Sequence, residues 1–152
     1  MVNAAIGILE RDRCILMIKR DKGLFSGLWG LPGGKVELNE HIDEAVIREF
    51  LEEAYINVEF SELLGVISEI VNIDESTHHS LLYCCELKSR IKINIKNDYL
   101  ELIPISDINK RSDIIPSDKI ILEELYLKSR KFNYLKIISN KINDGYDAHV
   151  IK

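Results

Sequence analysis

The chain has 152 residues and a net charge of −5; 46% of its residues are hydrophobic and 30% are charged. A chain of this length buries about 68–70% of its unfolded surface around one core, so we expect a single domain over residues 1–152. The acidic balance argues against a general nucleic-acid-binding surface, and no apolar run approaches the roughly 18 residues of a membrane-spanning helix.

The N-terminal part predicts two strands followed by a long loop. Residues 2–9 are rich in small and aliphatic side chains, a polar turn follows at 10–13, and the unbroken apolar run 14–18 is typical of a strand covered on both faces. Glycines punctuate residues 23–34, which indicates a loop that carries Trp29. This tryptophan either packs under the loop or stacks on a base beside a phosphate site.

The segment 31–58 has the most informative pattern of the chain. Pro32-Gly33-Gly34 predicts a turn, after which we expect an amphipathic helix with Asn39 as its first candidate cap. At 100° per residue, three glutamates fall within an arc of about 100° and an apolar group forms a second face. The acidic face holds Glu49, Glu52 and Glu53, and the apolar face holds Val46, Ile47, Phe50, Leu51 and Ala54.

The acidic face of this helix needs a counter-charge. Glu49 and Glu53 form an i,i+4 pair of like charges that costs an isolated helix roughly 0.2–0.5 kcal/mol, and Arg48 offsets only part of this cost through Glu52. A divalent cation such as Mg²⁺, which prefers oxygen ligands, would neutralise the cluster. The glycine pair before the helix would let the backbone approach a metal or a phosphate closely. The alternative is an ordinary solvated acidic face.

The segments that follow predict further strands. Residues 59–71 alternate enough for two strands or for one strand bent near Gly65, and 80–85 reads as a buried strand. The adjacent His78 and His79 would point to opposite faces of that strand, so we expect them to be non-catalytic. The remaining segments are predicted as an edge strand or hairpin at 88–98 and a strand at 99–104.

The C-terminal third of the chain predicts turns, a helix and a segment that could be helix or strand. Polar turns are expected at 105–115, and Pro116-Ser117 indicates the start of a helix with Ser117 as cap and about ten residues over 119–128. Residues 132–142 either extend this helix or form a strand, and Asn143-Asp144-Gly145 marks a turn.

Position by position, the segment 31–58 resembles the motif of the Nudix hydrolase family, G-x5-E-x7-R-E-U-x-E-E-x-G-U, where U is a bulky aliphatic residue. The matching residues are Gly34, Glu40, Arg48, Glu49, Glu52, Glu53 and Ile56, with Phe50 at the first U position. Tyr55 stands where the family has glycine, so we expect the helix to run slightly longer or to end with less regular geometry. The acidic face precedes Tyr55, and we therefore do not interpret this departure as inactivating.

The resemblance implies an α+β fold, an α/β/α sandwich with a mixed sheet between helices, and a hydrolase that depends on Mg²⁺ or Mn²⁺. Such an enzyme cleaves the pyrophosphate linkage of a nucleoside diphosphate joined to another group. Glu52 and Glu53 would be the principal metal ligands, with the Gly33 carbonyl as a further one. Glu49 would be either a ligand or the group that orients and deprotonates water. Arg48 would hold the glutamates in place.

The resemblance also suggests residues outside the helix. In related proteins a loop before the last sheet strand supplies another carboxylate, and Asp98 lies at about that place, with Glu101 as a second candidate. A plain hairpin aspartate is the alternative reading of Asp98. Trp29 and Gly34 are the candidate substrate contacts.

The run PGGKVE resembles the MutT-like branch, whose members often cleave nucleoside triphosphates to the monophosphate and pyrophosphate. ADP-ribose pyrophosphatases of the family often carry a proline after the motif, and none occurs between Pro32 and Pro104. We therefore expect a nucleoside triphosphate, with ADP-ribose or another nucleotide sugar as the alternative. A Nudix-like domain that binds a nucleotide without cleaving it is a second alternative. A hydrolase of RNA 5′ ends is a third, for which the chain shows no basic patch.

The cellular setting follows from what the sequence lacks. The N-terminus, MVNAAIGILERD, has no basic segment ahead of a long apolar one, and Cys14, Cys84 and Cys85 have no C-x-x-C spacing. We expect a cytoplasmic protein without disulfides, with a nucleotide as its partner, no stable nucleic-acid or membrane partner, and homodimerisation left open.

Overall fold

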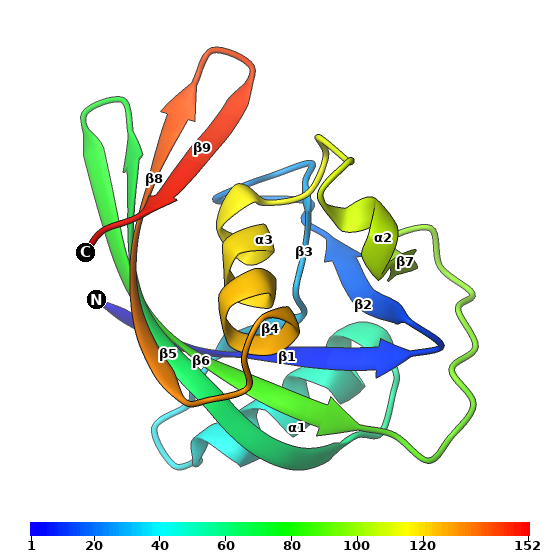
Figure 1. Ribbon diagram of the computed structural model, residues 1–152. Helices are drawn as coiled ribbons and strands as arrows, with labels where there is room; N and C mark the ends of the chain where they lie inside the picture. The colour runs from blue at the N-terminus through cyan, green and yellow to red at the C-terminus, as the bar shows by residue number, and fades with distance from the viewer.

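In the computed structural model, which describes residues 1–152, a curled mixed sheet is flanked by helices on both faces (Figure 1). The helices are α1 (Ile42–Ala54), α2 (Ile105–Ile108) and α3 (Pro116–Leu122), and a π-helical turn, η1 (Glu123–Leu127), continues α3. The strands are β1 (Val2–Arg11), β2 (Cys14–Lys19), β3 (Trp29–Gly30), β4 (Gly33–Lys35), β5 (Glu59–Ile73), β6 (Ser76–Lys88), β7 (Leu100–Pro104), β8 (Asn133–Ile142) and β9 (Gly145–Val150).

The nine strands form one sheet in the order β3-β2-β1-β6-β5-β8-β9, with β4 added to β1 and β7 added to β2. The pairs β1–β6 and β5–β8 are parallel and the other pairs are antiparallel. Figure 1 shows α1 on one face of the sheet and α3 on the other. The predicted mixed sheet between helices is therefore confirmed.

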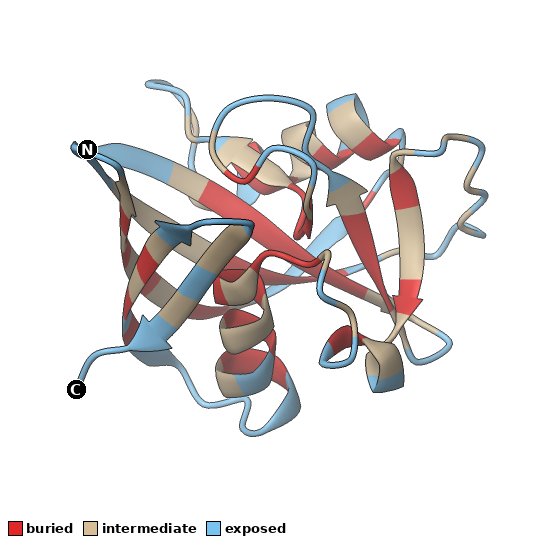
Figure 2. Ribbon diagram, turned by 90° about the horizontal axis from the view of Figure 1, so that it is seen from above, coloured by how far each residue is buried: buried red, intermediate tan, exposed pale blue.

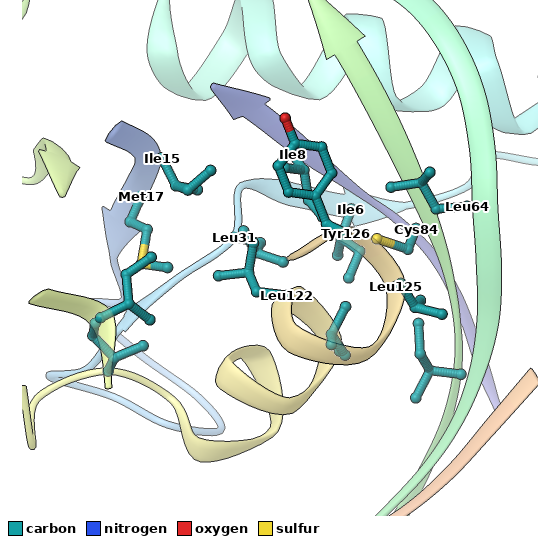
Figure 3. Packing of buried hydrophobic residues seen from close by; sticks show 14 of the residues in the cluster. Ile6, Ile8, Ile15, Met17, Leu31, Leu64, Cys84, Leu122, Leu125 and Tyr126 are labelled. Atoms are coloured by element: carbon teal, nitrogen blue, oxygen red, sulfur yellow. The ribbon is translucent and has the colours of Figure 1, made fainter. Parts of the chain in front are cut away.

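Strand β1 contributes to two separate cores because its side chains alternate across the sheet. Ala5 and Leu9 pack against α1, whereas Ile6 and Ile8 point into a larger cluster with α3 and η1 (Figure 3). Figure 2 shows buried residues concentrated along the middle of the sheet and on the inner sides of the helices. The two cores fix both helices relative to the same central strand.

Several predicted elements are confirmed. Strands occur at 2–11, 14–19 and 100–104, and the segment 59–73 is one strand with register irregularities between Phe60 and Glu62 and between Leu63 and Gly65. The segment 133–142 is a strand rather than a continuation of the helix. The cysteines are free, and no helix is long and apolar enough to cross a membrane.

The predicted edge strand or hairpin at 88–98 is wrong. Only Lys88 belongs to a strand, and residues 89–99 form no ladder. Ile93 and Ile95 do pack beside the α1 core, which explains the alternating sequence. This segment must cross from β6 to β7, which lie on opposite sides of β1, so its inward side chains are buried without a partner strand.

The predicted helix caps and the predicted glycine turn are also corrected. The N-cap of α1 is His41, whose backbone N–H donates to Glu44 Oε1 at 2.9 Å, and not Asn39. Helix α3 is capped by Ile115, which places Ser117 inside its first turn. Gly33 and Gly34 belong to strand β4, because pairing with β1 extends them. Leu51, assigned to the apolar face of α1, is 48% exposed.

The end of α1 differs from the expected longer or less regular helix. The helix stops at Ala54, and Tyr55 itself adopts the left-handed conformation, with φ 56° and ψ 34°. Its backbone N–H donates to the Phe50 carbonyl, so Tyr55 closes the helix as a glycine would. The Tyr55 side chain is 71% exposed and therefore avoids a clash while the backbone bears the strain.

Candidate functional site

The acidic face lies in the last two turns of α1, beside strand β4. Helix α1 has no basic residue in its last turn, where the helix dipole already disfavours negative charge. Glu49 and Glu53 stand one turn apart on this face, and both approach the β4 backbone. The sequence thus concentrates carboxylates where the helix cannot neutralise them.

Arg48 forms hydrogen bonds with four residues of the site. Its guanidinium binds Glu40 through Nε at 3.0 Å and Nη2 at 2.6 Å, and its Nη1 binds Glu49 at 2.9 Å and Glu52 at 3.3 Å. Nη2 also donates to the carbonyl of Lys35 at 3.1 Å, at the end of β4. The planar, forked guanidinium suits this role because it can bind several oxygens in fixed directions. Arg48 thereby ties the loop before α1 to the acidic face.

The two glycines of β4 let the glutamates approach the backbone. A Cβ at Gly34 would lie 2.4 Å from Glu49 Oε1, so this carboxylate occupies the space that a side chain would need. The backbone N–H of Gly33 donates to Glu53 Oε1 at 3.2 Å. The pairing of Gly34 with Ala5 on β1 holds β4 next to the carboxylates of Glu49 and Glu53.

Glu53 is partly buried, like Glu49. Burial, followed by the negative charge of Glu49, raises the pKa of Glu53 to about 7, against the lowering effect of the Gly33 N–H. A cation placed between the two groups would remove the repulsion and restore the ionised form. Hard carboxylate oxygens are also the ligands that Mg²⁺ and Mn²⁺ take in proteins. The residues therefore fit a divalent ion held by Glu49 and Glu53.

A cleft of about 500 Å³ opens beside these carboxylates. Glu52 and Glu53 contribute acidic groups to its lining, and the end of β2 and the residues after it contribute Lys19, Arg20 and Lys22. The lining residues are Ile18, Lys19, Arg20, Asp21, Lys22, Leu31, Gly33, Glu52, Glu53 and Tyr99. An anionic group bound here would meet positive side chains directly and would require a cation to approach the carboxylates.

A second cavity of about 280 Å³ lies on the α3 side of the sheet and shares Arg20, Leu31 and Gly33 with the cleft. Its walls are largely apolar and come from β1, β5, β6, the loop around Phe25 and the start of α3. Two nearly buried carboxyls, Glu69 on β5 and Asp118 on α3, also line it. The two spaces are therefore neighbours, and the second combines apolar side chains with the charged Arg20, Lys35, Glu69 and Asp118.

The structure places the predicted site residues in three locations: around Glu49 and Glu53, on the wall of the cleft, and outside both spaces. Glu49, Glu53, Gly33 and Gly34 come together, and Arg48 contacts the first of them. Glu52 lies on the cleft wall, but its carboxylate is 60% exposed and turned toward Arg48. No three carboxylate, imidazole or thiol groups stand in an arrangement that could hold a metal ion.

Two of the other sequence candidates, Trp29 and Asp98, line neither space, and neither does His79, which was expected to be non-catalytic. Trp29 is 8% exposed, packs in the larger core and lines neither space, which favours the packing alternative over the substrate contact. Asp98 is exposed and does not line the cleft, although its neighbour Tyr99 does. His79 bonds Ser68 Oγ at 2.8 Å and also lines neither space.

Sequence reasoning missed Arg20, Glu69 and Asp118. A signal existed for the two acids. Glu69 lies two residues from the buried Ile67 and Val71 and therefore points to the same face of β5. Asp118 lies three residues after Ile115 and four before Leu122, which places it on the buried side of α3. An acidic residue at a core-facing position is unusual and marks a candidate site. Arg20 directly follows β2 and carries no comparable signal.

Comparisons with known proteins show similarity over most of the chain. The profile of the NUDIX domain matches residues 1–125. The "ADP-ribose pyrophosphatase" of Methanocaldococcus jannaschii is 48% identical over 65 residues, which cover 43% of this chain and 38% of that protein. The "Nucleoside triphosphatase NudI" of Salmonella arizonae is 44% identical over 48 residues, which cover 30% of this chain and 34% of that protein. The matched part thus spans less than half the length of these relatives.

A solved structure extends the similarity to most of the chain. The NUDIX hydrolase from Nitrosomonas europaea superposes with a TM-score of 0.69 at 26% identity and covers 92% of this chain and 79% of the other.

Proposed function

Because the chain belongs to the Nudix family, we propose that it hydrolyses the pyrophosphate linkage of a nucleoside diphosphate derivative with the help of a divalent metal ion. Within this class we propose a nucleoside triphosphate as the substrate, cleaved to the monophosphate and pyrophosphate. The relative named as a nucleoside triphosphatase supports this choice.

The observation that carries the proposal is the presence of both signs of charge in one cleft. Glu52 and Glu53 line the same space of about 500 Å³ as Lys19, Arg20 and Lys22, together with Asp21. A polyphosphate can bind the lysines and the arginine directly, but it can approach the carboxylates only through a cation. Neither an uncharged substrate nor a simple cation would use both kinds of residue.

The residues of the chain then have distinct tasks. Glu49 and Glu53 would hold the ion, and the Gly33 carbonyl would be a further ligand, whereas Glu52 would have to turn from Arg48 to reach it. When bound, the ion withdraws negative charge from the phosphate oxygens and lowers the pKa of a coordinated water. Lys19, Arg20 and Lys22 orient the phosphates. Arg48 positions Glu49 by the 2.9 Å contact described above.

ADP-ribose is the second candidate substrate, because the relative from Methanocaldococcus jannaschii carries that name. Both substrates contain a pyrophosphate joined to a nucleoside, and the cleft itself does not distinguish them. The products do, because a triphosphate yields pyrophosphate and ADP-ribose yields AMP and ribose 5-phosphate.

The test is a substrate panel of nucleoside triphosphates, 8-oxo-dGTP, ADP-ribose and a dinucleoside polyphosphate, with Mg²⁺ or EDTA, analysed by ion-exchange chromatography. We expect triphosphate cleavage that EDTA abolishes. Glu53→Gln should lower turnover by at least about a hundredfold, since a lost ligand costs several kcal/mol of transition-state stabilisation. Glu62→Gln, at an exposed position of β5, is the matched control. Absence of cleavage of every anhydride with Mg²⁺ and Mn²⁺ would contradict the proposal.

A further inference from the structure

Strand β9 forms one end of the sheet, and no strand lies beyond it (Figure 1). It pairs with β8 along its whole length, from Ile137 opposite Val150 to Ile142 opposite Gly145. The opposite end of the sheet is β3, which has only two residues, so β9 is the longer of the two terminal strands. A free edge of this length is a template for pairing with another chain.

The backbone groups of β9 alternate between its paired edge and its free edge. The N–H of Ile151 donates to the Lys136 carbonyl at 2.8 Å, so these two residues form a hydrogen-bonded pair of the antiparallel ladder. Such pairs recur at every second residue, and the residues between them direct their backbone groups away from β8. The N–H and C=O groups of Tyr146, Ala148 and Val150 therefore lie on the free edge, and none of them bonds the backbone elsewhere in the chain.

Strand β9 lacks the features by which proteins commonly block an edge strand. Its sequence, GYDAHV, contains no proline and no lysine, and its ladder with β8 has no bulge. Tyr146 and Ala148 pack against buried clusters on the α3 side of the sheet. Asp147 and His149 lie on the other face, where both are exposed and neither forms an ion pair.

The positions of the free backbone groups determine how a second copy of β9 can pair with this edge. In an antiparallel pair related by a two-fold axis, the free groups of one strand bond those of the other only if even-numbered residues lie opposite even-numbered residues. An axis at Ala148 overlaps residues 146–150 of both strands and places Tyr146 opposite Val150 of the second copy. An axis at Tyr146 or at Val150 overlaps only the ends of the strands.

The side chains favour the axis at Ala148 over its two neighbours. This register places Asp147 opposite His149 of the second copy, and the two-fold axis repeats the pair. The pair is of the non-hydrogen-bonded kind, in which side chains come closest, and an imidazole N–H can donate to a carboxylate. An axis at Asp147 instead places that carboxylate opposite its own copy, and an axis at His149 does the same with the imidazole. Tyr146 opposite Val150 adds a favourable pair of an aromatic and a β-branched residue.

We propose that the free edge of β9 binds a second copy of this chain, antiparallel and about a two-fold axis at Ala148, so that the two sheets become continuous. The contact closes on itself and yields a dimer. It is independent of the proposed hydrolysis. One strand from each copy makes a small interface of the transient class, for which we expect a Kd of about 1–100 µM.

Ala148→Pro tests the backbone contact. Proline removes the N–H that points to the free edge, and the ladder with β8 does not use that N–H, so the hairpin itself is retained. His149→Asp tests the side-chain contact, because it places a carboxylate opposite Asp147 of the second copy. The double variant Asp147→His/His149→Asp restores the pair with its two members exchanged. His78→Asp is the matched control, since His78 is exposed on β6 and pairs with Val71 inside the sheet.

The experiment is sedimentation equilibrium over about 5–500 µM protein, a range that spans the expected Kd. We expect a monomer–dimer equilibrium for the wild type and for His78→Asp, and a monomer throughout for Ala148→Pro. His149→Asp should raise Kd by about tenfold or more, and the double variant should return it to within about threefold of the wild type. Amide hydrogen exchange measured by NMR should slow at Tyr146, Ala148 and Val150 as the wild-type concentration rises.

Folding of each variant is checked by far-UV circular dichroism and Tm, and His149→Asp decides the question if Ala148→Pro does not fold. A wild-type monomer at every concentration up to about 1 mM would overturn the inference. A dimer that folded Ala148→Pro and His149→Asp leave intact would overturn it as well, because another surface would then form the contact. Open-ended assemblies, or a double variant that pairs no better than His149→Asp, would contradict the two-fold register.

Discussion

Arg48 forms a bidentate ion pair with Glu40, with Nε–Oε2 at 3.0 Å and Nη2–Oε1 at 2.6 Å. This pair connects the loop before α1 with the helix itself, and the remaining nitrogen of the same guanidinium reaches Glu49. The side-chain hydrogen bond to Arg48 is the main reason that the pKa of Glu40 is lowered to about 2. The guanidinium of Arg48 therefore positions both the loop before α1 and the acidic face of the helix.

Arg48→Lys should reduce activity more than stability. A lysine keeps the charge, but its single ammonium group cannot bind two carboxylates and a carbonyl in fixed directions. We expect kcat to fall by about tenfold or more, because Glu49 loses its support, while Tm changes by only a few degrees. Steady-state kinetics with Mg²⁺ and thermal unfolding measure the two effects. Arg90→Lys is the matched control, since the Arg90 side chain is 89% exposed. Unchanged kcat would refute the positioning role.

Gly34→Ala tests the close approach of Glu49 to β4. The added Cβ would lie 2.4 Å from Glu49 Oε1, and the carboxylate can move away because it is the end of a flexible side chain. We therefore expect a folded protein whose turnover is at least about tenfold lower. Gly145→Ala serves as the control, because a Cβ there meets nothing within 4 Å. Retention of full activity would show that the observed Glu49 position is not needed.

The stability of the ligand-free protein should fall as pH rises from about 5 to 8. Burial raises the pKa of Asp118 from 3.8 to about 7, so the folded state binds a proton that the unfolded state has released in this range. This contribution is fully present below pH 3.8 and is lost as pH rises through about 7. It amounts to at most about 4 kcal/mol at 1.36 kcal/mol per pH unit.

Glu53 and Glu69 act in the same direction as Asp118, because burial also raises the pKa of each. Asp118→Asn should therefore reduce the pH slope without abolishing it, and it should raise Tm at pH 8 while leaving Tm at pH 5 nearly unchanged. Urea unfolding at several pH values measures the slope. An identical slope in wild type and variant would contradict the assignment to Asp118.

Tyr55→Gly should stabilise the protein. Tyr55 holds φ at 56°, a conformation that costs a residue with a side chain about 1 kcal/mol or more and costs glycine almost nothing. Little packing is lost, because the side chain is 71% exposed. We expect a gain of about 1 kcal/mol in the free energy of unfolding, measured in urea. Tyr134→Gly, at an exposed strand position, should destabilise instead. A loss of stability in Tyr55→Gly would show that the tyrosine ring contributes packing.

The sequence anticipated the elements whose pattern depends on neighbours along the chain. The helix over α1, the strands β1, β2 and β7, and the mixed character of the sheet followed from periodicity and from the motif. The left-handed Tyr55 was not anticipated, because the hydrogen bond from its N–H to Phe50 compensates for a conformation that local preference alone disfavours. The segment 89–99 was misassigned because alternation predicts which side chains are buried and not whether a strand lies beside them.

The sequence by itself determined the spacing of Arg48, Glu49 and Glu53, because residues on one helix are placed by its fixed pitch. Tertiary structure alone decided which distant groups join them. Arg20, Glu69 and Asp118 converge from β2, β5 and α3, and Trp29 moves into the core, because sheet order and the packing of α3 bring together residues whose separation in the chain carries no such information.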